Sequence, residues 1–232
     1  MLNKVTFAMG MGSLALMVAG VLLANKEIIP ARVGMLFFVL AGLVGIIAVG
    51  CAAAVALRTH AFHISLIGVL GVLPLMAVVT AGIEGLRYPP INDISTDLEE
   101  PPAFVHALTL PANAGRDMTF PQKWAGIIRK AERYQDLAPA RVDRPAADVF
   151  ETALRQAQQT RHWEVTYSDP ASGVIEAVVE TPMMKFRDDV IIRVRPDGEG
   201  AARVDMRSKS REGRSDLGAN AKRIRAFLEK VR

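Results

Sequence analysis

The sequence is poor in cysteine, histidine and aromatic residues. Its 232 residues include one cysteine, four histidines and 6% Phe, Trp and Tyr. Because Cys51 has no second cysteine to pair with, an intrachain disulfide and a cysteine-based metal site are both excluded. The formal net charge is only +4. A nucleic-acid-binding protein needs a strong positive surplus, so no nucleic acid is expected as a partner.

Charged residues are also missing from three long apolar stretches, residues 5–25, 33–57 and 59–83. About 20 apolar residues cross a bilayer core as a helix, and a helix is the form in which an isolated stretch satisfies its own backbone in lipid. The sequence therefore predicts three transmembrane helices within residues 1–84 and excludes an ordinary soluble protein. With no charged group embedded in them, a channel or pump is disfavoured.

Small residues recur at four-residue spacing in these stretches, which predicts close packing of the helices. The pairs are Ala8 and Gly12, Ala15 and Ala19, Ala41 and Gly45, and Gly50 and Ala54.

Other features of this part leave alternatives open. The first stretch follows Lys4 and contains the small residues of Val18-Ala19-Gly20, so it also fits a cleaved signal peptide; its length and the two stretches behind it favour an uncleaved helix. His60 and His63 would share a helix face, but no carboxylate or cysteine nearby completes a metal site. We predict no metal and no cofactor. The basic residues of the short loops are almost evenly distributed between the two sides of the membrane, so they favour neither orientation of the chain.

Residues 85–121 form a proline-rich strap. Two proline pairs, Pro89-Pro90 and Pro101-Pro102, exclude a long helix or a central strand, while scattered apolar side chains predict that the segment packs down on the neighbouring domain. Four acidic residues in the strap either bind a hard cation or form a solvated turn, and their spacing, which matches no EF-hand loop, favours the turn. They are Asp93, Asp97, Glu99 and Glu100.

Residues 122–232 predict an α+β domain. An amphipathic helix over 122–135, with Trp124 on its apolar face and a basic opposite face, either lies at the lipid interface or covers the domain's sheet. A second helix begins at Pro145 and ends near Thr160. The last helix is capped by Ser215 and carries an apolar stripe to Val231. Between these helices, period-2 patterns and turn signals predict strands at residues 162–168, 173–181, 186–195 and 202–210.

The fold class is therefore α+β, with three N-terminal transmembrane helices followed by an antiparallel four-stranded sheet flanked by helices. Pairing Val194 with Val204 sets the register of the last two strands, because it places Ile192 opposite Met206 on an apolar face. The same register sets Arg193 opposite Asp205 and Asp189 opposite Lys209 on a charged face. The simplest interpretation of these charges is a satisfied surface.

Residues 207–220 are the densest cluster of functional groups, where a strand leads through Gly213 into a helix start. Backbone N–H groups and arginines at such a point can bind a phosphate or a carboxylate. The candidate ligand-binding residues are Arg207, Arg211, Arg214, Ser215, Asn220, Asp188 and Asp189. The alternative is a self-satisfied network in which Asp188 or Asp189 pairs with Arg207 or Arg211.

Four motifs in the second part of the chain resemble the bacterial and plastid domain-of-unknown-function family 1499. They are residues 92–97 (NDISTD), 101–104 (PPAF), 186–190 (FRDDV) and 204–224 (VDMRSKSREGRSDLGANAKRI). The resemblance covers about residues 88–230. Many relatives look like lipoproteins or exported proteins, which implies an extracytoplasmic domain and a cytoplasmic amino terminus. Many also carry Asn-Cys where this chain has Asn92-Asp93, so no thiol role applies here. The resemblance implies no reaction.

These observations predict an integral protein of the inner (cytoplasmic) membrane with a non-catalytic envelope domain. Its expected partners are the lipid bilayer and an anionic or lipid ligand or a membrane-protein partner, with the apolar turn at residues 183–186 as a lipid-facing or partner-facing tip. One alternative is a hydrolase-like enzyme with Asp188 or Asp189 as its base and an Arg-rich anion site. Against it, no serine lies in a nucleophile-elbow pattern. The other alternative is a structural scaffold of a membrane complex.

Overall fold

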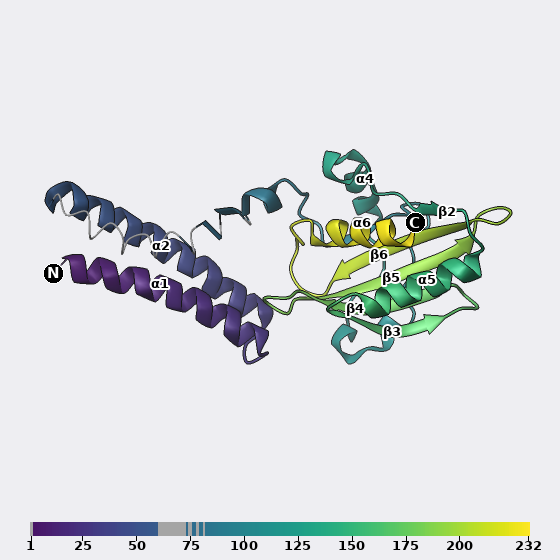
Figure 1. The fold of residues 1–232 in the computed structure, drawn as a ribbon, viewed down its shortest axis with the longest axis horizontal. Helices are drawn as coiled ribbons and strands as arrows, with labels where there is room; N and C mark the ends of the chain where they lie inside the picture. The colour runs from purple at the N-terminus through teal and green to yellow at the C-terminus, as the bar shows by residue number, and fades with distance from the viewer. Residues whose placement is uncertain (1, 60–72, 74–75, 78, 81) are drawn as a thin grey trace. The chain divides into compact units, whose positions relative to one another are not determined.

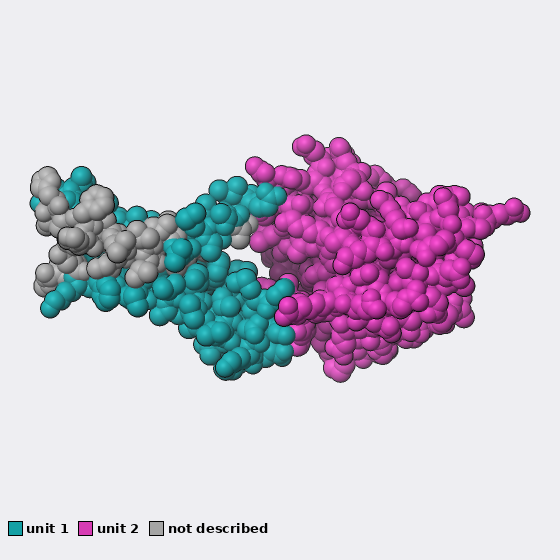
Figure 2. All heavy atoms as spheres, viewed as in Figure 1, with its two compact units in different colours: residues 1–84, 182–185 teal, residues 85–181, 186–232 magenta. Residues whose placement is uncertain are grey.

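The computed structural model describes residues 2–59, 73, 76–77, 79–80 and 82–232. It divides into two compact units, coloured separately in Figure 2. Unit 1 comprises residues 1–84 together with the loop 182–185, and unit 2 comprises residues 85–181 and 186–232.

Two antiparallel helices, α1 (Leu2–Asn25) and α2 (Ala31–Thr59), form most of the described part of unit 1 (Figure 1). Both are long and apolar enough to cross a membrane, and most of their surface is not buried inside the protein. The described residues thus hold two candidate spans where three were predicted. Most of the third stretch, with His60 and His63, lies outside the described residues.

The helices of unit 1 pack through small residues, as predicted; of the four predicted pairs, only Ala41 and Gly45 are buried, and other small residues make close contacts as well. A Cβ added to Gly20 would lie 2.6 Å from the Cβ of Phe37, and one added to Gly34 would lie 2.5 Å from the Cβ of Ala24. By contrast, a Cβ on Gly12 or Gly50 would meet open space. Large apolar side chains face outward instead, which suits helices surrounded by lipid. They include Val18, Leu22, Leu43, Ile46 and Ile47.

The loop predicted to be an apolar tip belongs to this unit. Asn25 Nδ2 donates hydrogen bonds to the carbonyl oxygens of Pro182, at 2.7 Å, and of Met183, at 3.3 Å. Met184 is buried, whereas the side chain of Met183 is 53% exposed.

Unit 2 is an α+β domain built on a six-stranded antiparallel sheet of order β1-β6-β5-β4-β3, with β2 also paired to β6. The four predicted strands are β3 (Trp163–Asp169), β4 (Val174–Glu180), β5 (Arg187–Pro196) and β6 (Ala202–Ser210). The predicted register of β5 and β6 is confirmed, with Val194 opposite Val204 and Arg193 opposite Asp205.

The count of four strands was wrong, because two three-residue strands extend the edge at β6. They are β1 (Asp93–Ser95), which comes from the strap, and β2 (Ala140–Val142).

Two helices, α5 (Ala146–Gln159) and α6 (Ala219–Val231), pack on one face of the sheet (Figure 1). The third helix, α4 (Gln122–Lys130), is shorter than predicted, because Ala131 is extended and a 3-10 turn, η3 (Glu132–Tyr134), follows. Ala125 and Ile128 of α4 are buried, and Ile128 joins the main core. Helix α4 therefore packs on the domain's core through Ile128, and a position of its basic face at the lipid interface stays a prediction.

The part of the strap that follows β1 covers the opposite face of the sheet, whereas Tyr88 and Ile91, which precede β1, pack in the main core. Between β1 and α4 the strap forms two 3-10 turns, η1 (His106–Thr109) and η2 (Pro111–Asn113). Phe104 and Met118 of the strap pack with Ile191 in a second core cluster. Because side chains alternate along a strand, Ile191 points away from the main core that holds Ile192. The sheet therefore has a buried layer on each side.

Helix α6 begins later than predicted. Gly218 stands at its N-cap with φ of 82°, and a Cβ there would lie 2.5 Å from the Tyr88 ring. Asp216, rather than Ser215, caps the helix, since its carboxylate accepts the N–H groups of Gly218 and Asn220, both at 2.9 Å. Ser215 was the wrong cap because the residue that must turn the chain here, Gly218, lies three positions later.

Candidate functional site

The charged face of β5 and β6 lies under the strap. Asp189, Asp205 and Arg207 are each at most 1% exposed, and Lys209 is 8% exposed. The interpretation of these residues as a satisfied surface was therefore half right: they are satisfied, but they form a buried layer. Burial of a charged side chain is costly unless the charge is paired, so the buried charges of this layer are expected to lie in ion pairs.

Arg207 is the centre of the buried layer. Its Nε and Nη2 donate to the two carboxylate oxygens of Asp93 in β1, both at 2.8 Å. Nη1 donates to the carbonyl of Pro102 at 3.1 Å, and Nη2 also donates to that of Met118 at 2.8 Å. Lys209 Nζ lies 2.9 Å from the same Asp93 carboxylate. Two strap rings face the guanidinium, those of Phe104 at 4.8 Å and Phe120 at 5.4 Å.

Asp189 holds the other end of the strap. Arg211 Nη2 donates to Asp189 Oδ1 at 2.7 Å, and Arg116 Nη1 donates to Oδ2 at 3.3 Å. Arg116 also donates to Ser210 O at 2.9 Å and to Asn113 Oδ1. Both oxygens of this carboxylate therefore accept hydrogen bonds from guanidinium groups.

Asp188 lies on the opposite face of the sheet, toward α6. Its carboxylate pairs with Arg223 Nη2 at 2.5 Å. Arg223 Nη1 donates in turn to Ser208 Oγ at 2.8 Å. Asn220, with no exposed surface, accepts a hydrogen bond from Ser208 Oγ at 2.7 Å and donates one to Ser210 Oγ at 3.0 Å.

The sheet therefore separates the seven candidate residues. Arg207, Arg211 and Asp189 belong to the strap side, and Asp188 and Asn220 to the helix side. The remaining two, Arg214 and Ser215, lie in the loop before α6, where Arg214 is exposed and Ser215 is half-buried. Binding of a ligand by these residues stays a prediction.

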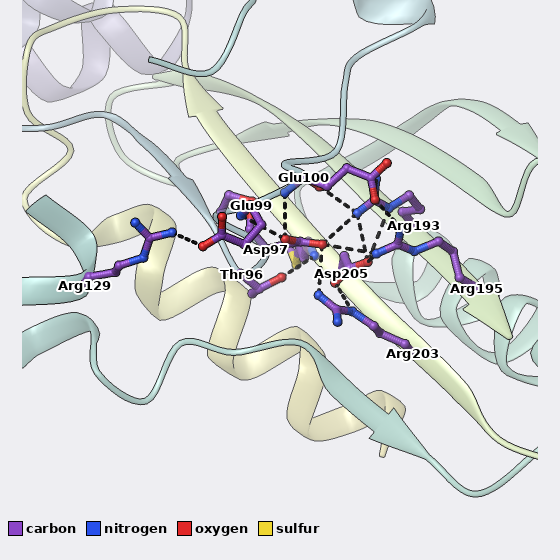
Figure 3. Close-up of polar contacts among 11 residues, drawn as sticks. Thr96, Asp97, Glu99, Glu100, Arg129, Arg193, Arg195, Arg203 and Asp205 are labelled. Carbon is purple, nitrogen blue, oxygen red and sulfur yellow. Dashed lines mark hydrogen bonds and ion pairs between the residues drawn. The ribbon is translucent and has the colours of Figure 1, made fainter. Parts of the chain in front are cut away.

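A third group of ion pairs is shown in Figure 3, and sequence reasoning found only its Arg193–Asp205 pair. Asp97 of the strap and Asp205 of β6 share three arginines from β5 and β6. Asp97 Oδ2 lies 3.2 Å from Arg193, 3.1 Å from Arg195 and 2.9 Å from Arg203. Asp205 lies 3.1, 2.8 and 2.9 Å from the same three arginines. Asp97 is thus part of an ionic network and not of a solvated turn.

The pKa of Asp97 reflects this environment. Burial alone would raise it, but the N–H groups of Glu100 and Glu99 and the charges of Arg203 and Arg193 together hold the pKa below its usual value. The carboxylate therefore remains ionised at neutral pH. The Arg193–Asp205 pair was visible in the strand register; Asp97 was not, because it is separated from Arg203 by more than 100 residues without a local pattern.

Two further buried groups differ from these ion pairs. Burial raises the pKa of Asp216, and the nearby negative charge of Asp188 adds to the effect. Tyr134 Oη is buried without a hydrogen-bond partner among the described residues, and burial raises the pKa of this phenol as well.

No group of three or more His, Cys, Asp or Glu side chains suited to a metal ion occurs in the described part of the chain. Of the four strap carboxylates that the sequence offers for a cation, Asp93 and Asp97 are occupied by buried or half-buried cationic side chains. Glu99 pairs with Arg129 and Glu100 with Arg195.

The comparisons with known proteins agree with the resemblance seen in the sequence. No curated protein and no solved structure matches the chain. The family described as "Protein of unknown function (DUF1499)" matches residues 93–231, from the first residue of β1 to the last of α6. Because this match covers more than half of the sequence, the chain belongs to the DUF1499 family.

Proposed function

We propose that this protein is a membrane-anchored, non-catalytic module of the cell envelope whose tail domain binds an anionic, lipid-like ligand. One observation carries the non-catalytic part of the proposal: the carboxylates of Asp188 and Asp189 and the guanidiniums of Arg207 and Arg211 are held in internal ion pairs. A general base or a substrate clamp needs a group that is available to the substrate. A hydrolase using these aspartates would first have to break the pairs that hold the strap and α6.

The anchor in this proposal crosses the membrane three times. Helices α1 and α2 return the chain to the side on which it began, and a third crossing by residues 59–83 carries it to the other side. With a cytoplasmic amino terminus, the tail domain is then extracytoplasmic. Such an arrangement places the domain next to lipid headgroups.

The test uses the full chain in lipid nanodiscs. Both tryptophans, Trp124 and Trp163, belong to unit 2, so their fluorescence reports unfolding of the tail domain alone. Nanodiscs of phosphatidylcholine are compared with nanodiscs containing phosphatidylglycerol. A ligand that binds only the folded state raises the unfolding midpoint, so we expect a higher midpoint with the anionic lipid and a smaller increase at high salt. Equal midpoints in both lipids would contradict the proposal and favour a scaffold.

A further inference from the structure

The loop of residues 182–185 joins strands β4 and β5, but its contacts place it in unit 1 (Figure 2). Both helices of that unit hold the loop. Asn25, the last residue of α1, donates hydrogen bonds to the carbonyl oxygens of Pro182 and Met183. On the side of α2, a Cβ added to Gly34 would lie 3.3 Å from Met184 Sδ. The position of the loop on α1 and α2 therefore follows from contacts within unit 1 alone.

The two methionines of this loop have different environments. Met184 is 5% exposed and lies against Gly34, where α1 is also close, because a Cβ on Gly34 would lie 2.5 Å from the Cβ of Ala24. An unbranched thioether side chain fills such irregular gaps. Met183, in contrast, is 53% exposed. Met184 thus fixes the loop on the helices, and Met183 is left at the surface.

The end of α1 marks one edge of a bilayer core. The candidate span Lys4–Asn25 has 22 residues, which is about 33 Å at about 1.5 Å per residue and matches a core of about 30 Å. Lys26 and Glu27 follow Asn25 directly, and charged side chains avoid the core. Because Asn25 binds the loop, Met183 lies at the same level, where the core meets the headgroups.

The same end of unit 1 carries other exposed apolar side chains. Leu22, one turn before Asn25 in α1, is 53% exposed, and Ile28 in the α1–α2 turn is 65% exposed. The loop itself contains no acidic residue. Apolar side chains at the end of membrane helices are shielded from water by the interfacial region of the lipid. Met183 therefore continues an apolar surface that suits lipid.

From this arrangement we infer that Met183 inserts into the lipid interface beside the α1–α2 turn, so that the β4–β5 loop is a lipid-binding tip. Its partner is the bilayer that holds the anchor, because Asn25 and Met184 fix the loop on the anchor's own helices. The inference rests on the proposed function and names a lipid contact made by a loop between two strands of the tail domain.

The experiment places the fluorophore nitrobenzoxadiazole on single cysteines of the full chain in phosphatidylcholine nanodiscs. A C51A background removes the native cysteine. M183C carries the fluorophore at the tip, and two positions serve as references, L22C on the exposed surface of α1 and E199C in the exposed β5–β6 turn. Spin-labelled phosphatidylcholine quenches a fluorophore in the bilayer, and iodide quenches one in water.

We expect the fluorophore at M183C to be quenched by the labelled lipid and protected from iodide, like the one at L22C. The fluorophore at E199C should show the opposite behaviour. Quenching at M183C should be strongest when the spin label is near the headgroup end of the acyl chain, because interfacial side chains lie about 5–10 Å into this boundary.

Two variants release the tip by different routes. N25A removes the donor of both hydrogen bonds, which should raise the undocked fraction of the loop roughly tenfold. M184D puts a charge at a buried position and so also favours the undocked loop. Both variants should increase iodide quenching at M183C. The matched control is N3A, at the other end of α1, which should leave it unchanged.

Three results would overturn the inference. If iodide quenches M183C as strongly as E199C, the tip lies in water. If M183C is protected from both quenchers, protein and not lipid covers the tip. In these two cases the proposed function is judged separately, by the unfolding midpoint in phosphatidylglycerol. If the labelled lipid fails to quench L22C as well, the helices are not in the bilayer, and the proposed function fails together with the inference.

Discussion

Asp93 and Arg207 show how single residues hold the strap on this domain. Asp93 has no exposed surface, and its two oxygens accept hydrogen bonds from Arg207 and Lys209. Burying such charges costs several kcal/mol per ion, and the attraction between the two ions approximately offsets this cost. The pair therefore adds little net stability, but the loss of either partner is expensive. That asymmetry makes the strap position specific.

Arg207→Met is expected to destabilise the tail domain strongly. The substitution leaves Asp93 with Lys209 alone and removes the donors to the carbonyls of Pro102 and Met118. Breaking a buried ion pair costs about 3–5 kcal/mol. Urea unfolding of the full chain in detergent, followed by tryptophan fluorescence, measures the loss of unfolding free energy.

The control for this prediction is Arg141→Met. Arg141 pairs with Asp143 and Asp197 at the surface, where its side chain is 61% exposed. Removal of such a pair costs about 0–1 kcal/mol. Equal losses in the two variants would show that Arg207 does not act as a buried ion-pair partner.

Asp216 predicts a pH dependence of stability. Burial, helped by Asp188, raises its folded-state pKa above the unfolded value of about 3.9. Its charged form therefore destabilises the folded state relative to its protonated form. The stability that the protonated Asp216 contributes is fully present below the unfolded pKa and is lost as the pH rises through the folded pKa. We expect the difference in unfolding free energy between the unchanged protein and D216N to shift in favour of the unchanged protein as pH falls from 8 to 4.

Asp136 supplies a control of opposite sign. A hydrogen bond from Arg225 lowers the pKa of Asp136, so its contribution is present above the unfolded pKa and is lost as pH falls. The difference in unfolding free energy between the unchanged protein and D136N should therefore shift in favour of D136N as the pH falls over the same range. The same trend in both variants would refute the assignment for Asp216.

At the scale of elements, the sheet shows which parts of the fold follow from local patterns. The strands β3 to β6 and the β5–β6 register follow from period-2 alternation and charge pairing. Strand β1 has three residues in a proline-rich segment, and its partner β6 lies more than 100 residues away. Nothing local marks such a strand, because its hydrogen bonds exist only after the strap has folded onto the sheet.

The candidate site divides in the same way. Its cations and carboxylates are recognisable in the sequence, and so is the Arg193–Asp205 pair, since both belong to adjacent strands. The partner of Arg207 is not recognisable, because Asp93 precedes it by 114 residues. The fact that neighbouring Asp188 and Asp189 serve opposite faces follows from strand alternation, once Asp188 is known to lie within β5.

The β3–β4 hairpin allows a sharp test of backbone geometry. Gly173 has φ of 67°, and a Cβ there would lie 2.1 Å from the carbonyl oxygen of Val194. Gly173→Ala should therefore lower the free energy of unfolding by at least about 3 kcal/mol, because the turn would be strained and strand β5 would also have to move away.

Gly200→Ala isolates the strain from the clash. Gly200 has φ of 71° in the β5–β6 turn, but a Cβ there would meet nothing within 4 Å. It should lose only about 1–2 kcal/mol, the cost of a left-handed conformation in a residue with a side chain. Urea unfolding compares the two variants, and equal losses would show that β5 does not approach this turn closely.

For the whole molecule, the number of membrane crossings decides which side the tail domain faces. Two crossings return the chain to the side of the amino terminus, whereas the proposed third crossing puts the tail on the side of the α1–α2 turn. Since Cys51 is the single cysteine, a C51A background accepts one reporter cysteine at a time. Two exposed positions suit this purpose, Ile28 in the turn and Arg214 in the loop before α6.

We expect Ile28→Cys and Arg214→Cys to react equally with a membrane-impermeant maleimide in intact cells, while Asn3→Cys reacts only after lysis. Equal labelling is the consequence of an odd number of crossings, because both residues then lie outside the cytoplasm. Labelling of Ile28→Cys without Arg214→Cys would show that the chain crosses twice and that the tail is cytoplasmic. An amino-terminal tag that remains on the mature protein distinguishes an uncleaved α1 from a signal peptide, because cleavage would remove the tag while leaving both cysteines labelled.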